Sequence, residues 1–107
     1  MKSLKLIGLA LGASFALSAG ALAQDINIGV AGPMTGGESA FGRPMKNGAE
    51  QVVGDTNAAG GVVGKKLALQ GGDDACDPQQ ARSVAGKFAS AELPSVAGHY
   101  HSSTAIP

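Results

Sequence analysis

The sequence is poor in aromatic residues and cysteine, and it has no clustered basic residues. Of its 107 residues none is Trp, one is Tyr and one is Cys. A single cysteine, Cys76, excludes an internal disulfide and leaves one thiol without a partner. Because Lys and Arg are not gathered into a basic patch, the sequence argues against a nucleic-acid-binding surface.

Charge is also missing from most of the first two dozen residues. After Lys2 and Lys5 no charged residue occurs before Asp25, and Ala21 and Ala23 form a small-x-small pattern around Leu22. A basic start, a short apolar stretch and a small-residue site are typical of a secretory signal peptide, which we predict for residues 1–23. A membrane anchor is the alternative, because the uncharged run is near the lower length limit for crossing a bilayer.

The remaining sequence, residues 24–107, alternates strand and helix patterns. Apolar residues at every second position predict a strand over 25–31, and a glycine-rich loop follows over 32–42. Helical spacing then predicts a helix over 44–59 with Pro44 in its first turn, ended by two glycines in a left-handed cap. A second strand is predicted over 65–71.

The second half repeats the pattern. Asp77 is expected to cap a helix whose first residue is Pro78 and which ends near Glu92. A short strand over 94–98 follows. The predicted buried stripe of this helix consists of Ala81, Val84, Ala85 and Phe88.

This order predicts an α/β fold, a parallel β-α-β-α-β arrangement followed by the start of another helix. Ligands of such sheets bind beyond the carboxyl ends of the strands. Here those ends are the segments 32–42, 71–77 and 99–104.

Hydroxyl residues stand at the last of these strand ends. Ser102 or Ser103 is expected to cap a third helix, with Thr104 next to them. The free N–H groups of a helix start favour an anion, and the hydroxyls of Ser102, Ser103 and Thr104 add donors, so the predicted ligand group of these three residues is a carboxylate. The alternative is that the serine only caps the helix.

Other chemistries have weaker support. Two histidines, His99 and His101, have the spacing to share a metal, but a third ligand has to come from Asp73, Asp74 or Asp77. The alternative is a polar rim with aspartates that cap and solvate their loop, and we expect no metal and no cofactor.

Enzymatic motifs are also absent. Ser102 and His101 are neighbours on an extended chain and point apart, which argues against a nucleophile and base pair. The glycines at 32–37 and 60–66 have neither dinucleotide nor phosphate-loop spacing. We therefore expect no enzyme.

Four segments resemble one protein family. They are GPMTG at 32–36, the stretch at 41–67, DDACDPQQA at 73–81 and GHYHSSTAIP at 98–107. They are similar to the periplasmic substrate-binding proteins of branched-chain amino acid ABC transporters, the leucine/isoleucine/valine-binding type. The resemblance implies a two-lobed protein, with residues 24–107 as an incomplete first lobe.

The resemblance also implies a function. A member of this family is a periplasmic monomer that delivers branched-chain or related amino acids to the membrane permease of an ABC transporter. The alternative is a ligand-sensing domain of the same fold, such as an amide or receptor-type sensor.

Individual residues match family positions. The resemblance implies that Phe41 lines the ligand cleft and that Ser102 binds the α-carboxylate of the ligand. Family members often pair the cysteine that matches Cys76 with a second cysteine just before the binding serine. Here that position is His101, so this bridge is absent.

Overall fold

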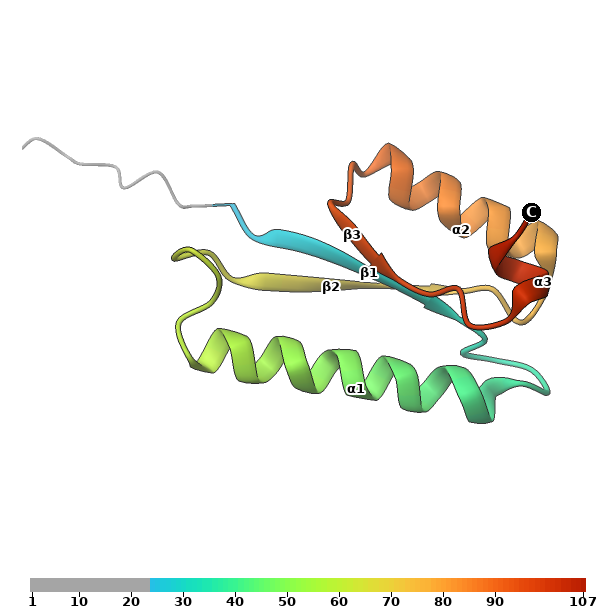
Figure 1. Cartoon of the computed structure of the whole chain (residues 1–107), viewed down its shortest axis with the longest axis horizontal. Coiled ribbons are helices and arrows are strands. Elements are labelled where there is room, and N and C mark those ends of the chain that lie inside the picture. Colours follow the sequence, from blue (N-terminus) through green and yellow to red (C-terminus); the bar gives the residue numbers. More distant parts are fainter. Residues whose placement is uncertain (1–23) are drawn as a thin grey trace, which may run out of the picture.

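The computed structural model describes residues 24–107, so the predicted signal peptide lies outside the described residues. Strands and helices alternate along the chain (Figure 1). They are β1 (Ile26–Gly32), α1 (Ser39–Ala58), β2 (Leu67–Asp73), α2 (Pro78–Ser90), β3 (Ser95–Ala97) and α3 (Ser102–Ala105). Within residues 24–107 no helix is long and apolar enough to cross a membrane.

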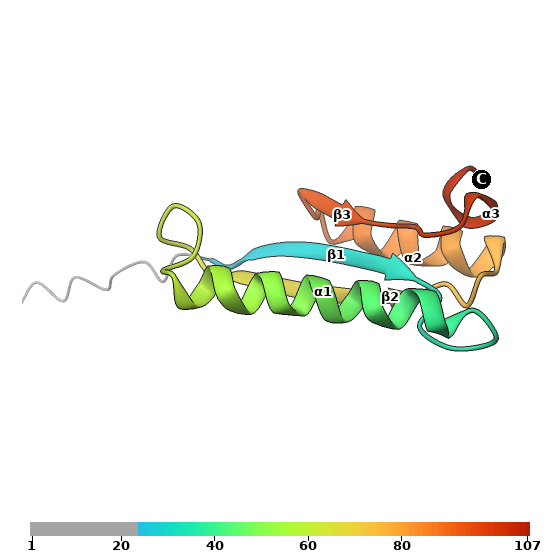
Figure 2. The same cartoon turned by 60° about the horizontal axis from the view of Figure 1, so that its bottom comes forward.

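The three strands form one parallel sheet in the order β2-β1-β3. The central strand β1 pairs with β2 along its whole length, from Ile26 opposite Leu67 to Gly32 opposite Asp73. Helix α1 covers one face of the sheet, and α2 covers the other (Figures 1 and 2). The predicted α/β fold with a parallel sheet is confirmed for this part of the chain.

The core lies between the sheet and α2. The N-terminal cap that the sequence predicts for α2 is confirmed, because the Asp77 carboxylate accepts hydrogen bonds from the N–H groups of Gln79 and Gln80. The expected burial of Ala85 is wrong: it is exposed, because it lines an open hollow between α2 and β3 instead of packing against the sheet. The buried residues of α2 are Ala81, Val84 and Phe88.

Helix α1 begins five residues earlier than predicted, at Ser39, so Pro44 lies inside the helix instead of in its first turn. Gly42 explains part of this difference. A side chain at Gly42 would overlap the backbone of Pro33, so only glycine lets the helix start against the preceding loop. Glycine richness, which predicted a loop, here permits close packing of a helix.

The end of α1 agrees with the sequence prediction. Gly60 and Gly61 have left-handed φ angles of 107° and 80°. The Gly61 N–H donates to the carbonyl of Thr56 at 2.9 Å and the Gly60 N–H to that of Asn57 at 3.1 Å. These two bonds form the Schellman arrangement that ends helices. The chain is thereby turned toward β2.

Candidate functional site

Three connections meet at the carboxyl end of the parallel strands. The β1–α1 loop, the β2–α2 loop and the segment between β3 and α3 all lie at this edge of the sheet (Figure 1). They are the three segments at which the sequence predicts ligand binding. The edge is therefore the candidate site.

Asp73, at the end of β2, binds the β1–α1 loop. Its carboxylate accepts hydrogen bonds from the N–H groups of Met34 at 2.8 Å and Thr35 at 3.3 Å, and from the Thr35 hydroxyl. Partial burial acts to raise the pKa of Asp73. Hydrogen bonds from Thr35, Ala75 and Met34 outweigh it and lower the pKa below the ordinary value of 3.8.

Asp74, the next residue, binds the segment after β3. It is fully buried, and its Oδ2 atom lies 2.6 Å from Nδ1 of His99, which is itself almost buried. A carboxylate oxygen accepts hydrogen bonds, so we assign the Nδ1–H group of His99 as the donor of this bond. The other oxygen accepts from the Cys76 N–H at 2.8 Å. A buried carboxylate is stable only with such partners.

These two carboxylates hold a turn of unusual backbone shape. Ala75 and Cys76 have left-handed φ angles of 47° and 61°, although neither is glycine. The Asp77 N–H closes the turn on the Asp74 carbonyl at 2.7 Å, and the Asp73 carboxylate accepts from the Ala75 N–H at 2.9 Å. The expectation that the aspartates merely cap and solvate the loop is wrong for Asp74, whose carboxylate is removed from water.

The expected capping of α3 by Ser102 or Ser103 is wrong, because the helix already begins at Ser102 and its N-cap lies one residue earlier. His101 is the N-cap residue, and its carbonyl accepts from the N–H and the hydroxyl of Thr104. Thr104 is buried, and its hydroxyl is taken up by this bond to the backbone of its own turn. Within the described part of the chain, the N–H groups of Ser102 and Ser103 have no hydrogen-bond acceptor, as expected for a first helical turn.

Aromatic rings cluster around the two residues that directly precede these free N–H groups in the chain. Phe41, in the first turn of α1, stacks on Tyr100 with ring centroids 5.5 Å apart, and about half of each side chain is exposed. The ring of His101 meets both edge-on, and its Nε2 atom lies 3.5 Å from Glu38. The structure thus brings the predicted Phe41 to Tyr100 and His101, the two residues that precede the predicted serines. Tyr100 was missed, although its place between two histidines at a strand end was a usable signal.

The two histidines do not share a site. His99 faces Asp74, whereas His101 contacts Glu38 and the rings. In residues 24–107 no group of three His, Cys, Asp or Glu side chains lies close enough to hold a metal ion. Cys76 reaches α3 instead, with its sulfur 4.0 Å from the Ser103 hydroxyl oxygen.

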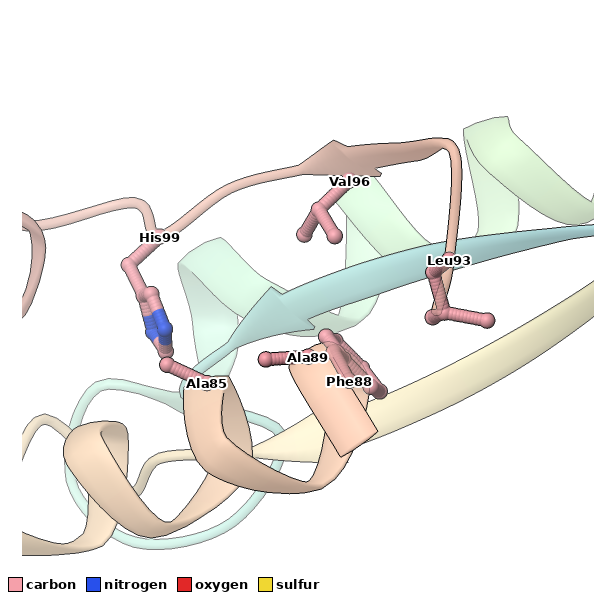
Figure 3. A pocket seen from close by; sticks show the side chains of 6 residues that line it. All are labelled: Ala85, Phe88, Ala89, Leu93, Val96 and His99. Atoms are coloured by element: carbon pink, nitrogen blue, oxygen red, sulfur yellow. The ribbon is translucent and has the colours of Figure 1, made fainter. Parts of the chain in front are cut away.

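A separate hollow lies between α2 and β3. Figure 3 shows the His99 ring projecting from the chain after β3 toward Ala85 on α2. The hollow has a volume of about 280 Å³ and offers no polar side chain other than His99. An apolar wall of this kind does not suit a carboxylate. It is lined by Ala85, Phe88, Ala89, Leu93, Val96 and His99.

Comparison with known proteins agrees with this geometry. Residues 25–106 match a family described as periplasmic binding protein. The chain is 46% identical over 83 residues to a Leu/Ile/Val-binding protein homolog of Brucella abortus, covering 78% of this chain and 22% of that protein. It is 45% identical over 94 residues to the Leu/Ile/Val-binding protein of Escherichia coli, covering 88% and 26%.

A solved structure of a binding protein is also similar to this chain. The branched-chain amino acid transporter substrate-binding protein of Streptococcus pneumoniae, solved with isoleucine, superposes with a TM-score of 0.72 at 28% identity. The match covers 76% of this chain and 24% of that one. The chain thus spans about a quarter of the length of these relatives, which are named as binding proteins. The chain belongs to the periplasmic binding protein family.

Proposed function

We propose that this chain is part of an extracytoplasmic solute-binding protein that delivers branched-chain or related amino acids to an ABC transporter. Two of the relatives are named for leucine, isoleucine and valine, and the solved neighbour holds isoleucine. The proposed partners are a free amino acid and the membrane permease. The proposed location is the periplasm, and the proposed state of the whole protein is a monomer.

One observation carries the proposal: free N–H groups and aromatic faces belong to the same strand-end edge, because Tyr100, which stacks on Phe41, lies two residues before Ser102 in the chain. The N–H groups and hydroxyls of Ser102 and Ser103 offer hydrogen-bond donors for a carboxylate. The half-exposed rings of Phe41 and Tyr100 offer an apolar surface. An amino acid with an aliphatic side chain needs both. Thr104 contributes by holding the turn that presents the serines.

A chimera provides the test, because the chain spans only about a quarter of its relatives. Residues 24–107 replace the matching segment of the Escherichia coli Leu/Ile/Val-binding protein, and calorimetry measures leucine binding. Ser102→Ala is expected to weaken binding roughly tenfold, since it removes a hydrogen bond to a charged group. Ser90→Ala, an exposed serine at the end of α2, is the control and should leave the affinity unchanged. Equal affinities of the two variants would reject the assignment.

A further inference from the structure

Two adjacent aspartates connect three separate loops. Asp73 accepts hydrogen bonds from Met34 and Thr35 in the β1–α1 loop. Asp74 accepts one from His99 in the segment after β3. Successive side chains at the end of a strand point to opposite sides, so one dipeptide can reach both neighbouring connections. Because β2 is an edge strand, the link to β3 passes across the end of β1.

We propose that Asp73 and Asp74 form a positioning unit for the amino acid site. Asp73 fixes the β1–α1 loop, which leads into the helical turn that carries Phe41. Asp74 fixes His99, three residues before Ser102. The two bonds set the distance and angle between the ring of Phe41 and the hydrogen-bond donors of Ser102 and Ser103. The inference rests on the function proposed above and concerns the same site.

The contacts of Asp74 are the strongest part of this unit. Its carboxylate has no access to water and accepts from two groups, one of them His99 at 2.6 Å. Hydrogen bonds to charged groups in such surroundings are stronger than neutral ones. The backbone takes part as well, because the Asp74 N–H donates to the carbonyl of Gly32 at 3.0 Å. Asp74 thus contacts all three strand ends.

The link between these loops is noncovalent. Cys76 is the only cysteine of the sequence, so no disulfide within the chain ties the β2–α2 loop to α3. Its sulfur lies 4.0 Å from the Ser103 oxygen, which is a weak contact at most. The relative placement of the loops therefore depends on the two carboxylates.

The Asp73 side of the unit is tested with a matched pair at Thr35, an exposed residue whose replacement should not impair folding. Thr35→Ser keeps the hydroxyl that donates to Asp73, whereas Thr35→Val removes it and keeps the shape. In the chimera, Thr35→Val should weaken leucine binding about fivefold and Thr35→Ser less than about twofold. Neither substitution changes a group proposed to touch the ligand.

The Asp74 side is tested with a second matched pair. His99→Asn places an amide N–H near the position of Nδ1, and His99→Gln places it near Nε2. Both remove the ring, and Gln fills more of its space than Asn, so a role in packing alone would make His99→Gln the milder change. We expect His99→Gln to weaken leucine binding roughly tenfold and His99→Asn to retain most of it. Nitrogen NMR of the unaltered chimera should show a proton on Nδ1 of His99.

The outcomes separate the two proposals. If the unaltered chimera binds no amino acid, the proposed function falls and the positioning inference with it. If it binds leucine while both matched pairs behave alike, the inference alone is overturned. A His99 ring protonated only at Nε2 would also overturn it, because the bond to Asp74 would then lack its donor.

Discussion

Two turns of this chain have a similar backbone shape and differ in what holds them. Val63 and Gly64 have left-handed φ angles of 52° and 74°, and Ala75 and Cys76 have 47° and 61°. The first turn is a hairpin closed by backbone bonds between Val62 and Lys65, at 2.7 and 2.9 Å. It contains a glycine, and its Val63 side chain is 93% exposed.

The second turn lies at the candidate site and has no glycine. Two carboxylates hold its N–H groups, and one of these carboxylates is fully buried. Left-handed residues other than glycine persist where the surrounding structure over-determines them, and they cluster at functional sites. The turn at the site therefore depends on the carboxylates of Asp73 and Asp74, whereas the exposed turn depends on its local backbone hydrogen bonds alone.

The largest expected effect comes from removing Asp74. Asp74→Ala takes the acceptor from His99 and from the Cys76 N–H, and it leaves both groups without partners in a buried place. Breaking a buried pair on one side typically lowers the free energy of unfolding by about 3–5 kcal/mol. Urea unfolding of the chimera, followed by circular dichroism, should show this loss. A change no larger than that of an exposed substitution such as Ser90→Ala would contradict the central role of Asp74.

A smaller effect is expected at Asp73. Replacing it with Asn should lower the free energy of unfolding at neutral pH by about 1.5 kcal/mol, because charge-assisted hydrogen bonds from Thr35 and Met34 are weakened. The measurement is the urea midpoint of the chimera with and without Asp73→Asn at pH 7.

The same substitution predicts a dependence on pH. The folded-state pKa of Asp73 lies below its ordinary value of 3.8, so its contribution is complete above that value. It is lost as the pH falls through the lowered pKa. The advantage of the unaltered protein over Asp73→Asn should therefore shrink below pH 3.8. An advantage that stays constant from pH 7 to pH 2 would show that the charge of Asp73 does not matter.

The smallest effect is expected in the exposed hairpin. Val63→Asn should raise the free energy of unfolding by about 1 kcal/mol, because asparagine adopts left-handed angles at lower cost than a β-branched residue. Val62→Asn is the matched control, since Val62 does not have a positive φ angle. Equal shifts of the urea midpoint in both variants would mean that the backbone strain at Val63 is negligible.

Much of the fold could be predicted because its signals are local. Apolar alternation located β1, and the Asp77 cap and the two glycines after α1 depend on a few neighbouring residues. The start of α1 could not be predicted in the same way. It depends on the contact between Gly42 and Pro33, which the sequence pattern shows only as a glycine-rich loop.

The sequence predicted the edge of the sheet at which the candidate site lies, but it did not predict the hydrogen bonds that hold the loops of this edge. The order of the predicted strands placed Ser102 and Ser103 at the carboxyl-end edge of the sheet, where the structure has them. The separate roles of Asp73 and Asp74 depend on the register that sets Gly32 opposite Asp73, and on the path of the chain after β3. Both are long-range features. The available signal was the pair of aspartates at the end of β2, which we expected only to cap and solvate their loop.

The most direct test of the central claim is a crystal structure of the chimera with leucine bound. The account predicts that the leucine carboxylate accepts hydrogen bonds from the N–H groups of Ser102 and Ser103, with the side chain against the ring of Phe41. It also predicts an intact bond between His99 and Asp74 beneath them. A carboxylate bound elsewhere, with these N–H groups facing solvent, would contradict the account.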